Sequence, residues 1–213
     1  MLRSLKQLYG EKLEAIDGEI GAIKDFYFDD QNWAVRYLAA DTGDWLAGRK
    51  VLLSPHALAA SSGKAMRVSL TRKKIEKSPA VGPHNQVLRD YEEKYYKYYG
   101  WPPYWTTKAR SVAGPRPEPD AHLRSTQAVN GYLVRVGDET IGHVCDFMVN
   151  TENWEIGQLV VKTGHRLSGK DTLIPTKQVE RISYDDSTVF AHPAVEVSKP
   201  TPANNLVPAG IIL

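Results

Sequence analysis

The most distinctive side chains of this 213-residue chain are aromatic, and they gather in one short stretch, residues 85–105. Apolar residues recur there at the spacing of one helical face, at Leu88, Tyr91, Tyr95 and Tyr98. Asn85 is a suitable N-cap, and Gly100 followed by Pro102-Pro103 is a suitable end. The pattern predicts a helix over about residues 86–99.

The aromatic side chains of this stretch could cover the chain's own core, contact a partner protein or stack on bases. Stacking on single-stranded nucleic acid needs a cationic groove beside the rings, whereas Asp90, Glu92 and Glu93 would repel a phosphate backbone. Packing within the chain or against a protein is therefore favoured. The candidate partner-binding residues are Tyr91, Tyr95, Tyr98, Trp101, Tyr104 and Trp105.

A second candidate surface is a group of basic side chains between residues 67 and 77. This basic cluster consists of Arg67, Arg72, Lys73, Lys74 and Lys77. It could bind RNA phosphates, with an affinity that falls as salt rises, or it could be a solvated helix face. The whole chain carries 27 basic and 25 acidic residues, so its net charge of +2 shows no general preference for nucleic acid.

Residues that could catalyse a reaction do not form a recognisable site. Cys145 follows His143 by two residues, so a strand would place both side chains on one face, where the histidine could act as a base. The histidines lack the spacing of a zinc site, and no glycine-rich phosphate-binding loop is present. We therefore expect no enzyme activity, no catalytic residues, no metal and no cofactor.

Two copies of one unit organise the chain. The residue types Ile-Gly, Asp-Phe and Asn-Trp at positions 20–33 return at positions 141–154, at a constant spacing of 121 residues. Each copy also begins with Leu-Arg-Ser, at Leu2 and at Leu123. Such internal repetition indicates one small fold used twice. The first copy has Lys24 where the second has Cys145, so Cys-His chemistry is not part of the shared unit.

Each copy reads as a series of short strands separated by turn signals. Strands are expected at residues 34–40, 50–53 and 66–70, and at 155–161, 171–174 and 187–191. Gly21 and its copy predict a bend or a close backbone approach. Asp25 and its copy should accept hydrogen bonds from turn amides, with a catalytic acid as the alternative. Trp33 and its copy should pack in the core or form paired docking surfaces.

These patterns predict a mainly β fold with two small antiparallel barrels joined by a Tyr-rich helix and a Pro-rich linker. The first barrel should span residues 1–79, the helix and linker residues 80–122, and the second barrel residues 123–200. Residues 201–213 form a C-terminal tail with an apolar end, which could dock on a barrel or a neighbouring subunit.

The doubled Gly21/Asp25 pattern, with its Leu-Arg-Ser starts, resembles the PRC-barrel family over residues 2–79 and 123–200. This family includes the cytoplasmic domain of the photosynthetic reaction-centre H subunit and the C-terminal domain of the ribosome-maturation factor RimM. The Trp-Pro-Pro-Tyr-Trp insert is similar to that of stand-alone bacterial relatives with two barrels. The resemblance implies six-stranded PRC-type β-barrels that contact proteins or RNA without catalysis. The chain differs from the H subunit because no membrane helix precedes its first barrel.

The leading hypothesis is a non-catalytic interaction or scaffold protein that binds a protein partner and self-associates as a homodimer. The alternatives are an RNA- or ribosome-associated factor and a component of a photosynthetic or electron-transfer membrane complex. No window approaches about 20 apolar residues, and the start lacks the apolar core of a signal peptide. A single cysteine suits a reducing compartment. We therefore expect a bacterial cytoplasmic protein without membrane insertion.

Overall fold

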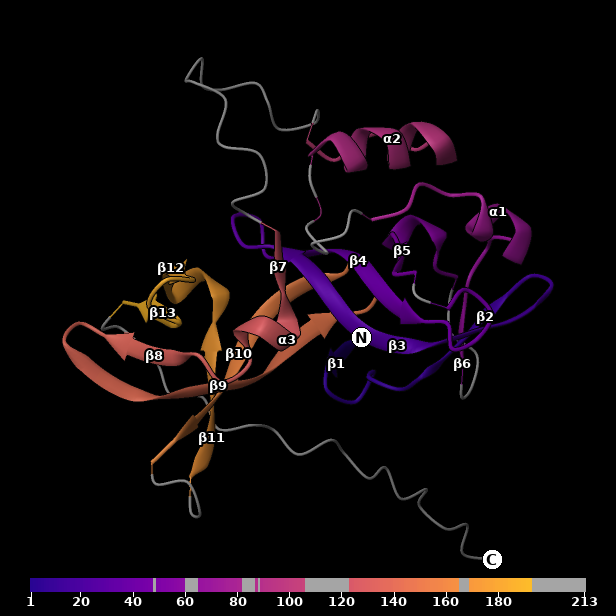
Figure 1. The fold of residues 1–213 in the computed structure, drawn as a ribbon. Helices are drawn as coiled ribbons and strands as arrows, with labels where there is room; N and C mark the ends of the chain where they lie inside the picture. The colour runs from indigo at the N-terminus through magenta and orange to yellow at the C-terminus, as the bar shows by residue number, and fades with distance from the viewer. Residues whose placement is uncertain are drawn as a thin grey trace, which may run out of the picture.

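The computed structural model describes residues 1–47, 49–59, 65–81, 87, 89–105, 123–164 and 169–192 (Figure 1). Within these residues the fold is mainly β, as expected, and thirteen strands form one continuous sheet. The path runs β12-β13-β8-β9-β10-β4-β3-β2-β6 and does not close on itself, so two separate closed barrels are not seen there. The predicted N-cap Asn85, the Pro-rich linker 106–122 and the tail 201–213 lie outside the described residues.

The elements of the two repeats correspond closely. The first repeat contains β1 (Leu2–Ser4), β2 (Lys12–Ala15), β3 (Gly18–Asp29), β4 (Ala34–Asp41), β5 (Val51–Leu53), η1 (Pro55–Ala57), β6 (Ala65–Arg67) and α1 (Arg72–Glu76), and α2 (Arg89–Tyr99) follows it. The second contains β7 (Leu123–Ser125), α3 (Thr126–Val129), β8 (Leu133–Val136), β9 (Glu139–Asn150), β10 (Glu155–Thr163), β11 (Lys170–Pro175), η2 (Thr176–Gln178), β12 (Val179–Ser183) and β13 (Thr188–Ala191). The long strands β3 and β9 begin and end at equivalent positions, so the expected strand pattern is confirmed in both copies.

The two repeats exchange their first strands. β1 pairs antiparallel with β9 of the second repeat, and β7 pairs antiparallel with β3 of the first. Each Leu-Arg-Ser segment therefore completes the sheet of the other repeat. Two self-contained barrels were expected because each copy was considered alone. A repeated sequence does not show whether a strand pairs within its own copy or with the other one.

The hairpin turns before β4 and β10 also meet reciprocally. The Val35 amide donates to the Trp154 carbonyl at 2.9 Å, and the Ile156 amide donates to the Trp33 carbonyl at 2.7 Å. Both tryptophans have left-handed backbone conformations, with φ of 51° and 60°, which are uncommon for bulky residues. Matching contacts in both directions give the repeats an approximate twofold relationship, as in an isologous interface.

Asp25 and its copy Asp146 hold the exchanged segments. Asp25 accepts hydrogen bonds from the Ser125 hydroxyl at 2.6 Å, the Thr126 hydroxyl at 3.0 Å and the Gln127 amide at 3.2 Å. Asp146 accepts in the same way from the Ser4 hydroxyl and, at 3.0 Å, from the Lys6 amide. The predicted role as acceptor of turn amides is confirmed, but the turn in each case belongs to the other repeat.

Two β-bulges recur at equivalent positions and aim these side chains. The register of β3 against β4 shifts at Lys24, and that of β9 against β10 shifts at Cys145, immediately before each aspartate. A second shift skips Arg36 in β4 and its copy Gly157 in β10. A bulge bends its strand and redirects a side chain, so the bulges turn each aspartate toward the other repeat.

Gly21 and Gly142 mark close backbone approaches, as the sequence predicts. A Cβ atom on Gly21 would lie 1.9 Å from the Asp41 carbonyl oxygen, and one on Gly142 would lie 2.2 Å from that of Lys162. Both distances are far inside van der Waals contact, so glycine alone allows the long strands to cross their neighbours at these points.

The interior of the two repeats is continuous. Phe28 of the first repeat contacts Phe147 of the second, with ring centroids 5.5 Å apart, and Phe26 stacks on Trp154 at 6.2 Å. Trp33 stacks on Phe28 at 5.5 Å. Trp154 is buried in the core and Trp33 is partly buried against it, so the packing interpretation is confirmed for both. Aromatic rings bury large apolar areas, and here they join the halves into one core.

The copies differ at their last hairpin. Leu58 bridges Val68 in the first repeat, whereas Val179 pairs with Ala191 in the second, so the hairpin is two residues longer there. A difference of two residues leaves inward-facing side chains on the same face of the strand. The repeat is therefore ungapped through its main strands but not through this hairpin.

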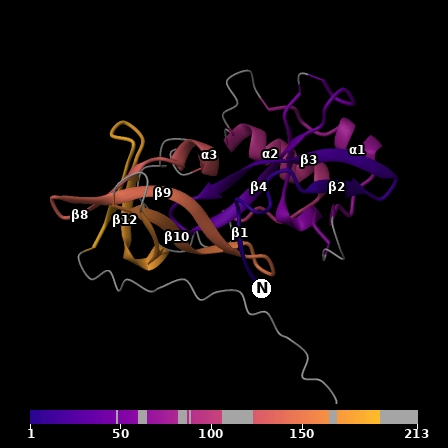
Figure 2. The same ribbon diagram turned by 90° about the horizontal axis from the view of Figure 1, so that it is seen from below.

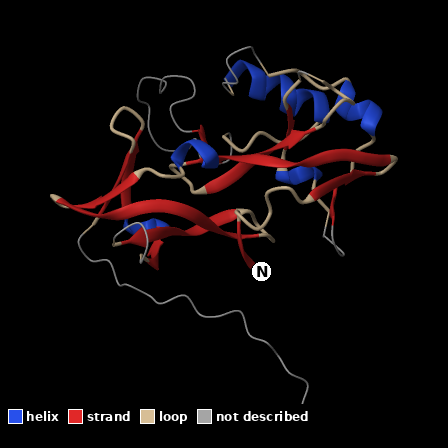
Figure 3. Cartoon of the chain, turned by 60° about the horizontal axis from the view of Figure 1, so that its bottom comes forward, coloured by secondary structure: helices blue, strands red, loops and turns tan. Residues whose placement is uncertain are grey.

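The longer helices lie over the first repeat alone. Figure 2 shows α1 and α2 beside β2, β3 and β4. Among the described residues of the second repeat the helical segments (helices are blue in Figure 3) are the short α3, which contacts β3 of the first repeat, and η2. The α1 helix is anchored by the fully buried Ile75. The pair of repeats is thus nearly symmetric in its sheet and asymmetric in its covering.

We predict that Asp25→Ala lowers the free energy of unfolding by about 1–3 kcal/mol, because it leaves two hydroxyls and an amide of the other repeat without their acceptor. Urea unfolding measures the change. Asp186→Ala, which removes a similar contact in an exposed turn, should change the value by less than about 0.5 kcal/mol. Equal effects of the two substitutions would contradict the role of Asp25.

Candidate protein-binding site

The α2 helix buries its aromatic residues against the first repeat. Its buried side chains are Tyr91, Glu92, Tyr95, Tyr96 and Tyr99. Tyr95 is fully buried: its hydroxyl donates to the Leu52 carbonyl at 3.1 Å and accepts from the Ser54 amide at 3.0 Å. Its ring meets that of Tyr37 edge-on at 5.4 Å. The helix is thereby fastened to β4 and β5, which is the intramolecular packing that the sequence left as one alternative.

The buried face of α2 differs from the predicted one at Tyr98. That side chain is 37% exposed, although its hydroxyl donates to the Lys74 carbonyl at 2.8 Å. The chain has adjacent tyrosine pairs at this point, so two neighbouring faces have nearly equal aromatic content. The end of the helix agrees with expectation: Gly100 has a φ of 72°, and the Trp101 amide donates to the Tyr96 carbonyl at 3.1 Å, as in a Schellman motif.

Residues 101–105 fold back on the helix and extend its aromatic cluster. Trp101 stacks on Tyr99 with centroids 4.6 Å apart and planes 12° apart, and Trp105 meets Tyr96 edge-on at 5.1 Å. Tyr104 also contacts Tyr96, at 6.0 Å. The structure therefore brings all six predicted residues into one cluster over the first repeat. Their role in binding a partner stays a prediction.

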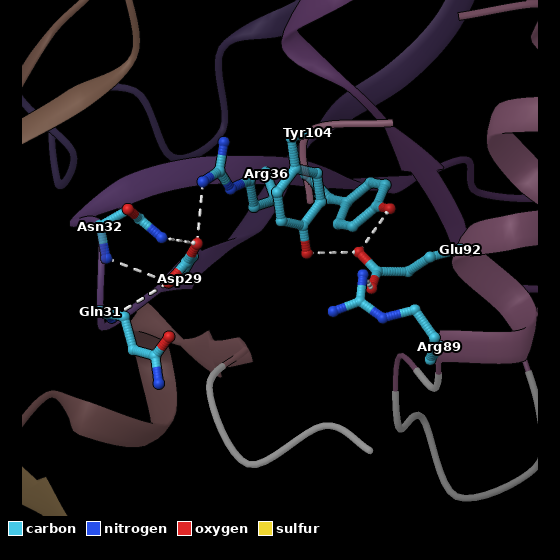
Figure 4. A network of polar contacts seen from close by, with 8 residues as sticks. Asp29, Gln31, Asn32, Arg36, Arg89, Glu92 and Tyr104 are labelled. Carbon is cyan, nitrogen blue, oxygen red and sulfur yellow. Dashed lines mark hydrogen bonds and ion pairs between the residues drawn. The ribbon is translucent and has the colours of Figure 1, made fainter. Parts of the chain in front are cut away.

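A buried carboxylate, Glu92, ties this cluster to the sheet (Figure 4). Its side chain is 1% exposed, and its Oε1 accepts from the Tyr37 hydroxyl at 2.9 Å and the Tyr104 hydroxyl at 2.8 Å. Its Oε2 lies 2.8 Å from Arg89. Burial, followed by the charge of Glu92, raises the pKa of Tyr37 and of Tyr104, so both phenols remain donors.

Arg36 links this network to the hairpin before β4. Its guanidinium lies 2.8 Å from Asp29 and over the Tyr104 ring at 3.9 Å (Figure 4). Burial raises the pKa of Asp29, but hydrogen bonds from Arg36 and Asn32 outweigh it and leave that pKa below its ordinary value. The Arg36–Asp29 pair is therefore a charged contact at neutral pH, held at the bulge of β4.

A groove of about 1160 Å³ lies where the first repeat, the aromatic insert and the second repeat meet. The first repeat contributes Val35, Arg36 and Met66, and the insert contributes Tyr96 and Tyr104. The hairpin 151–154 of the second repeat forms the opposite wall, together with Arg3 of the exchanged β1. Its size suits a peptide segment or a small ligand, so this groove is the candidate binding site.

Most of the basic cluster lies on or beside α1, away from this groove, whereas Arg67 lies on β6 next to the groove residue Met66. Lys73, Lys74 and Lys77 are exposed on α1, and Arg67 is exposed on β6. Arg72 lies over the Trp45 ring at 4.5 Å, and its amide donates to Asp17 at 2.7 Å. The four exposed cations make no ion pair with the residues that the structure describes. RNA binding by the cluster stays a prediction.

The environment of Cys145 does not favour nucleophilic chemistry. Burial raises the pKa of its thiol, and the charges of Asp171 and Asp146 raise it further, whereas an activated cysteine has a lowered pKa. Cys145 is also the bulged residue of β9, so the simple alternation that would place it beside His143 is interrupted. Among the described residues, no group of three or more His, Cys, Asp or Glu side chains could hold a metal ion.

The second repeat matches a known family. Residues 129–196 match the family model for the PRC-barrel domain. This part of the chain is a PRC-barrel domain. It covers β8 to β13, and these strands recur in the first repeat except for β12, whose place is taken by the isolated bridge at Leu58. No curated protein matches the chain. Within the described residues, no helix is long and apolar enough to cross a bilayer.

Sequence reasoning missed the buried charges and the groove. The sequence indicates Glu92 only as a charge that would repel a phosphate backbone, whereas in the structure it is buried and is the central acceptor of the insert. Arg3 and Arg36 were not candidates, although Arg36 is one of the few strand positions where the copies differ sharply, having Gly157 as its counterpart. That difference between repeats was the available signal.

We predict that Glu92→Gln lowers the free energy of unfolding by about 2–3 kcal/mol, because it removes the charge that Arg89 faces and weakens an acceptor of two buried phenols. Chemical denaturation followed by tryptophan fluorescence checks this. The exposed neighbour Glu93→Gln is the matched control and should change stability by less than about 0.5 kcal/mol. Similar losses in both variants would show that the Glu92 contacts are not stabilising.

We predict that stability falls as pH rises above about 10. Burial raises the pKa of Tyr37 and Tyr95 well above the ordinary 10.0. In this range the unfolded chain releases phenol protons that the folded chain retains, so unfolding is favoured as pH increases. Below pH 10 the contribution of these tyrosines is fully present. Urea midpoints across the alkaline range measure the slope, which Tyr37→Phe should make shallower; an unchanged slope would contradict the assignment.

Proposed function

We propose that this protein is a non-catalytic interaction scaffold that binds a protein partner through the groove between its repeats. The groove is the observation that carries the proposal, because both repeats and the insert contribute to it. The PRC-barrel domain at residues 129–196 is consistent with such a role. A binding surface built from several segments is a reason for the chain to keep two repeats joined.

The first repeat belongs to this proposal as a second PRC-type unit. Its support is the shared skeleton: strands in the same order apart from β12, the same two bulges, and an equivalent aspartate that accepts from the exchanged segment. The polar residues of that skeleton are engaged in structural contacts, as Asp25 and Asp146 are with the exchanged segments. This arrangement favours a binding role over catalysis.

Self-association is also part of the proposal, since two-fold homodimers are the commonest oligomers. Apolar side chains remain exposed on both repeats, including Ile16 on the β2–β3 hairpin and Leu133 on β8. A homodimer could cover one of these surfaces. Sedimentation of the full chain should then show a species of twice 23.8 kDa at high protein concentration.

An RNA-associated role is the second candidate. It is favoured by one observation, the exposed cations of α1, which are not paired with described acidic residues. Phosphate contacts of this kind would weaken as salt increases. Glu76 and the nearby Asp17 reduce the local positive charge, which is why the protein partner is preferred.

We predict that the tagged full chain, crosslinked in native lysate, captures a protein that remains bound after ribonuclease treatment. Mass spectrometry of the captured material provides the measurement. A Lys73→Gln/Lys74→Gln variant should capture the same protein, because neither lysine lines the groove. Capture that disappears with ribonuclease, or with this variant, would favour RNA. Capture of nothing beyond an untagged control would refute the scaffold role.

A further inference from the structure

The groove combines an apolar floor with fixed positive charge. Val35, Met66 and Trp154 are buried residues that line it, and the Tyr96 and Tyr104 rings stand beside them. Apolar and aromatic surface of this kind binds aliphatic or aromatic side chains of a ligand. The floor draws on both repeats, because Trp154 belongs to the hairpin of the second.

Two arginines supply the positive charge. Arg3 is 30% exposed and Arg36 is 18% exposed, and each is held by a carboxylate that does not line the groove: Glu11 at 3.3 Å and Asp29 at 2.8 Å. Their side chains are thus positioned before any ligand arrives, which reduces the entropy lost on binding. Among the lining residues that the structure describes, the carboxylate is Glu152, which is 78% exposed and therefore well solvated.

One of the two charges is specific to this side of the molecule: Arg3 has a copy, Arg124, in the other repeat, whereas Arg36 has none. Arg36 occupies the bulge of β4, where the second repeat has Gly157. Tyr96 and Tyr104 come from the insert that follows the first repeat, and they line the groove on this side. Within the described residues, the approximate twofold relationship therefore leaves the charge of Arg36 and the aromatic wall on this side alone.

We infer that this groove binds an acidic peptide segment with apolar side chains, presented by the partner protein. The inference rests on the proposed scaffold function and specifies the chemistry of its partner. Carboxylates of the segment pair with Arg3 and Arg36, and its apolar side chains cover Val35, Met66 and Trp154. Charge-assisted contacts with arginine add orientation as well as affinity. In an extended segment alternate side chains face opposite sides, so acidic and apolar side chains can meet different walls of the groove.

The test measures binding of a fluorescent peptide of about eight residues that alternates Glu and Leu, a length that spans about 26 Å when extended. Anisotropy titrations use the full chain. Peptides alternating Lys with Leu, and Glu with Ser, serve as probes that lack the acidic or the apolar component. We expect saturable binding of the Glu-Leu peptide and affinities at least about tenfold weaker for the other two. Equal binding of all three would overturn the inference.

Variants locate the site. Arg3→Gln and Arg36→Gln should each weaken binding of the Glu-Leu peptide by about tenfold. Because both arginines also make ion pairs within the fold, thermal melts accompany each titration. Ala59→Trp, at a lining position, fills the groove without changing its charge and should also abolish binding. Lys177→Gln replaces the exposed cation at the position equivalent to His56 in the other repeat, and should leave the affinity unchanged.

The outcomes separate this inference from the proposed function. If the captured partner is unaffected by Arg3→Gln, Arg36→Gln and Ala59→Trp, the scaffold role stands and the groove is not its site. If a labelled oligouridylate binds with the same sensitivity to these variants, the groove binds nucleic acid and the peptide assignment is wrong. Failure of the Glu-Leu peptide to bind while melts remain normal would also overturn it.

Discussion

Hydrogen bonds from Ser125 and Gln127 to Asp25, and from Ser4 and Lys6 to Asp146, join the start of each repeat to the sheet of the other. A buried or half-buried carboxylate is stable only where donors replace its lost water. Each repeat therefore supplies the hydrogen-bond donors for the aspartate of the other, so the two repeats must be present together. This reciprocal exchange explains why the strands form a single open sheet and share one core.

A nearly symmetric framework becomes asymmetric through the insert between the repeats. The α2 helix and residues 101–105 cover the first repeat, and Glu92 holds them there through two phenols and Arg89. Such a network stabilises a fold when its members are fully satisfied and is costly when one is removed. The same segments form one wall of the groove. Stability of the insert and formation of the proposed binding site are thus coupled.

The bulges show how one framework can carry two surfaces. Lys24 and Cys145 occupy one bulge, and Arg36 and Gly157 occupy the other. Both repeats keep the bulged backbone, because it orients the aspartates. The identity of the side chain at each bulge differs between the repeats. In the first repeat this position supplies the guanidinium that contacts Asp29, Tyr104 and the groove.

The order of strands, the roles of Gly21 and Asp25, the end of α2 at Gly100 and the core position of the tryptophans followed from the sequence alone. These features depend on local periodicity, turn chemistry and a repeat that can be counted. Which copy receives β1, which face of the tyrosine-rich helix is covered, and that Glu92 is buried were decided only by tertiary structure. The two Leu-Arg-Ser strands have the same sequence, so either could pair with either copy. The adjacent tyrosines of α2 offer two helix faces of similar hydrophobicity. Only the packing of the two repeats against each other distinguishes these alternatives, since it determines where each polar group finds a partner.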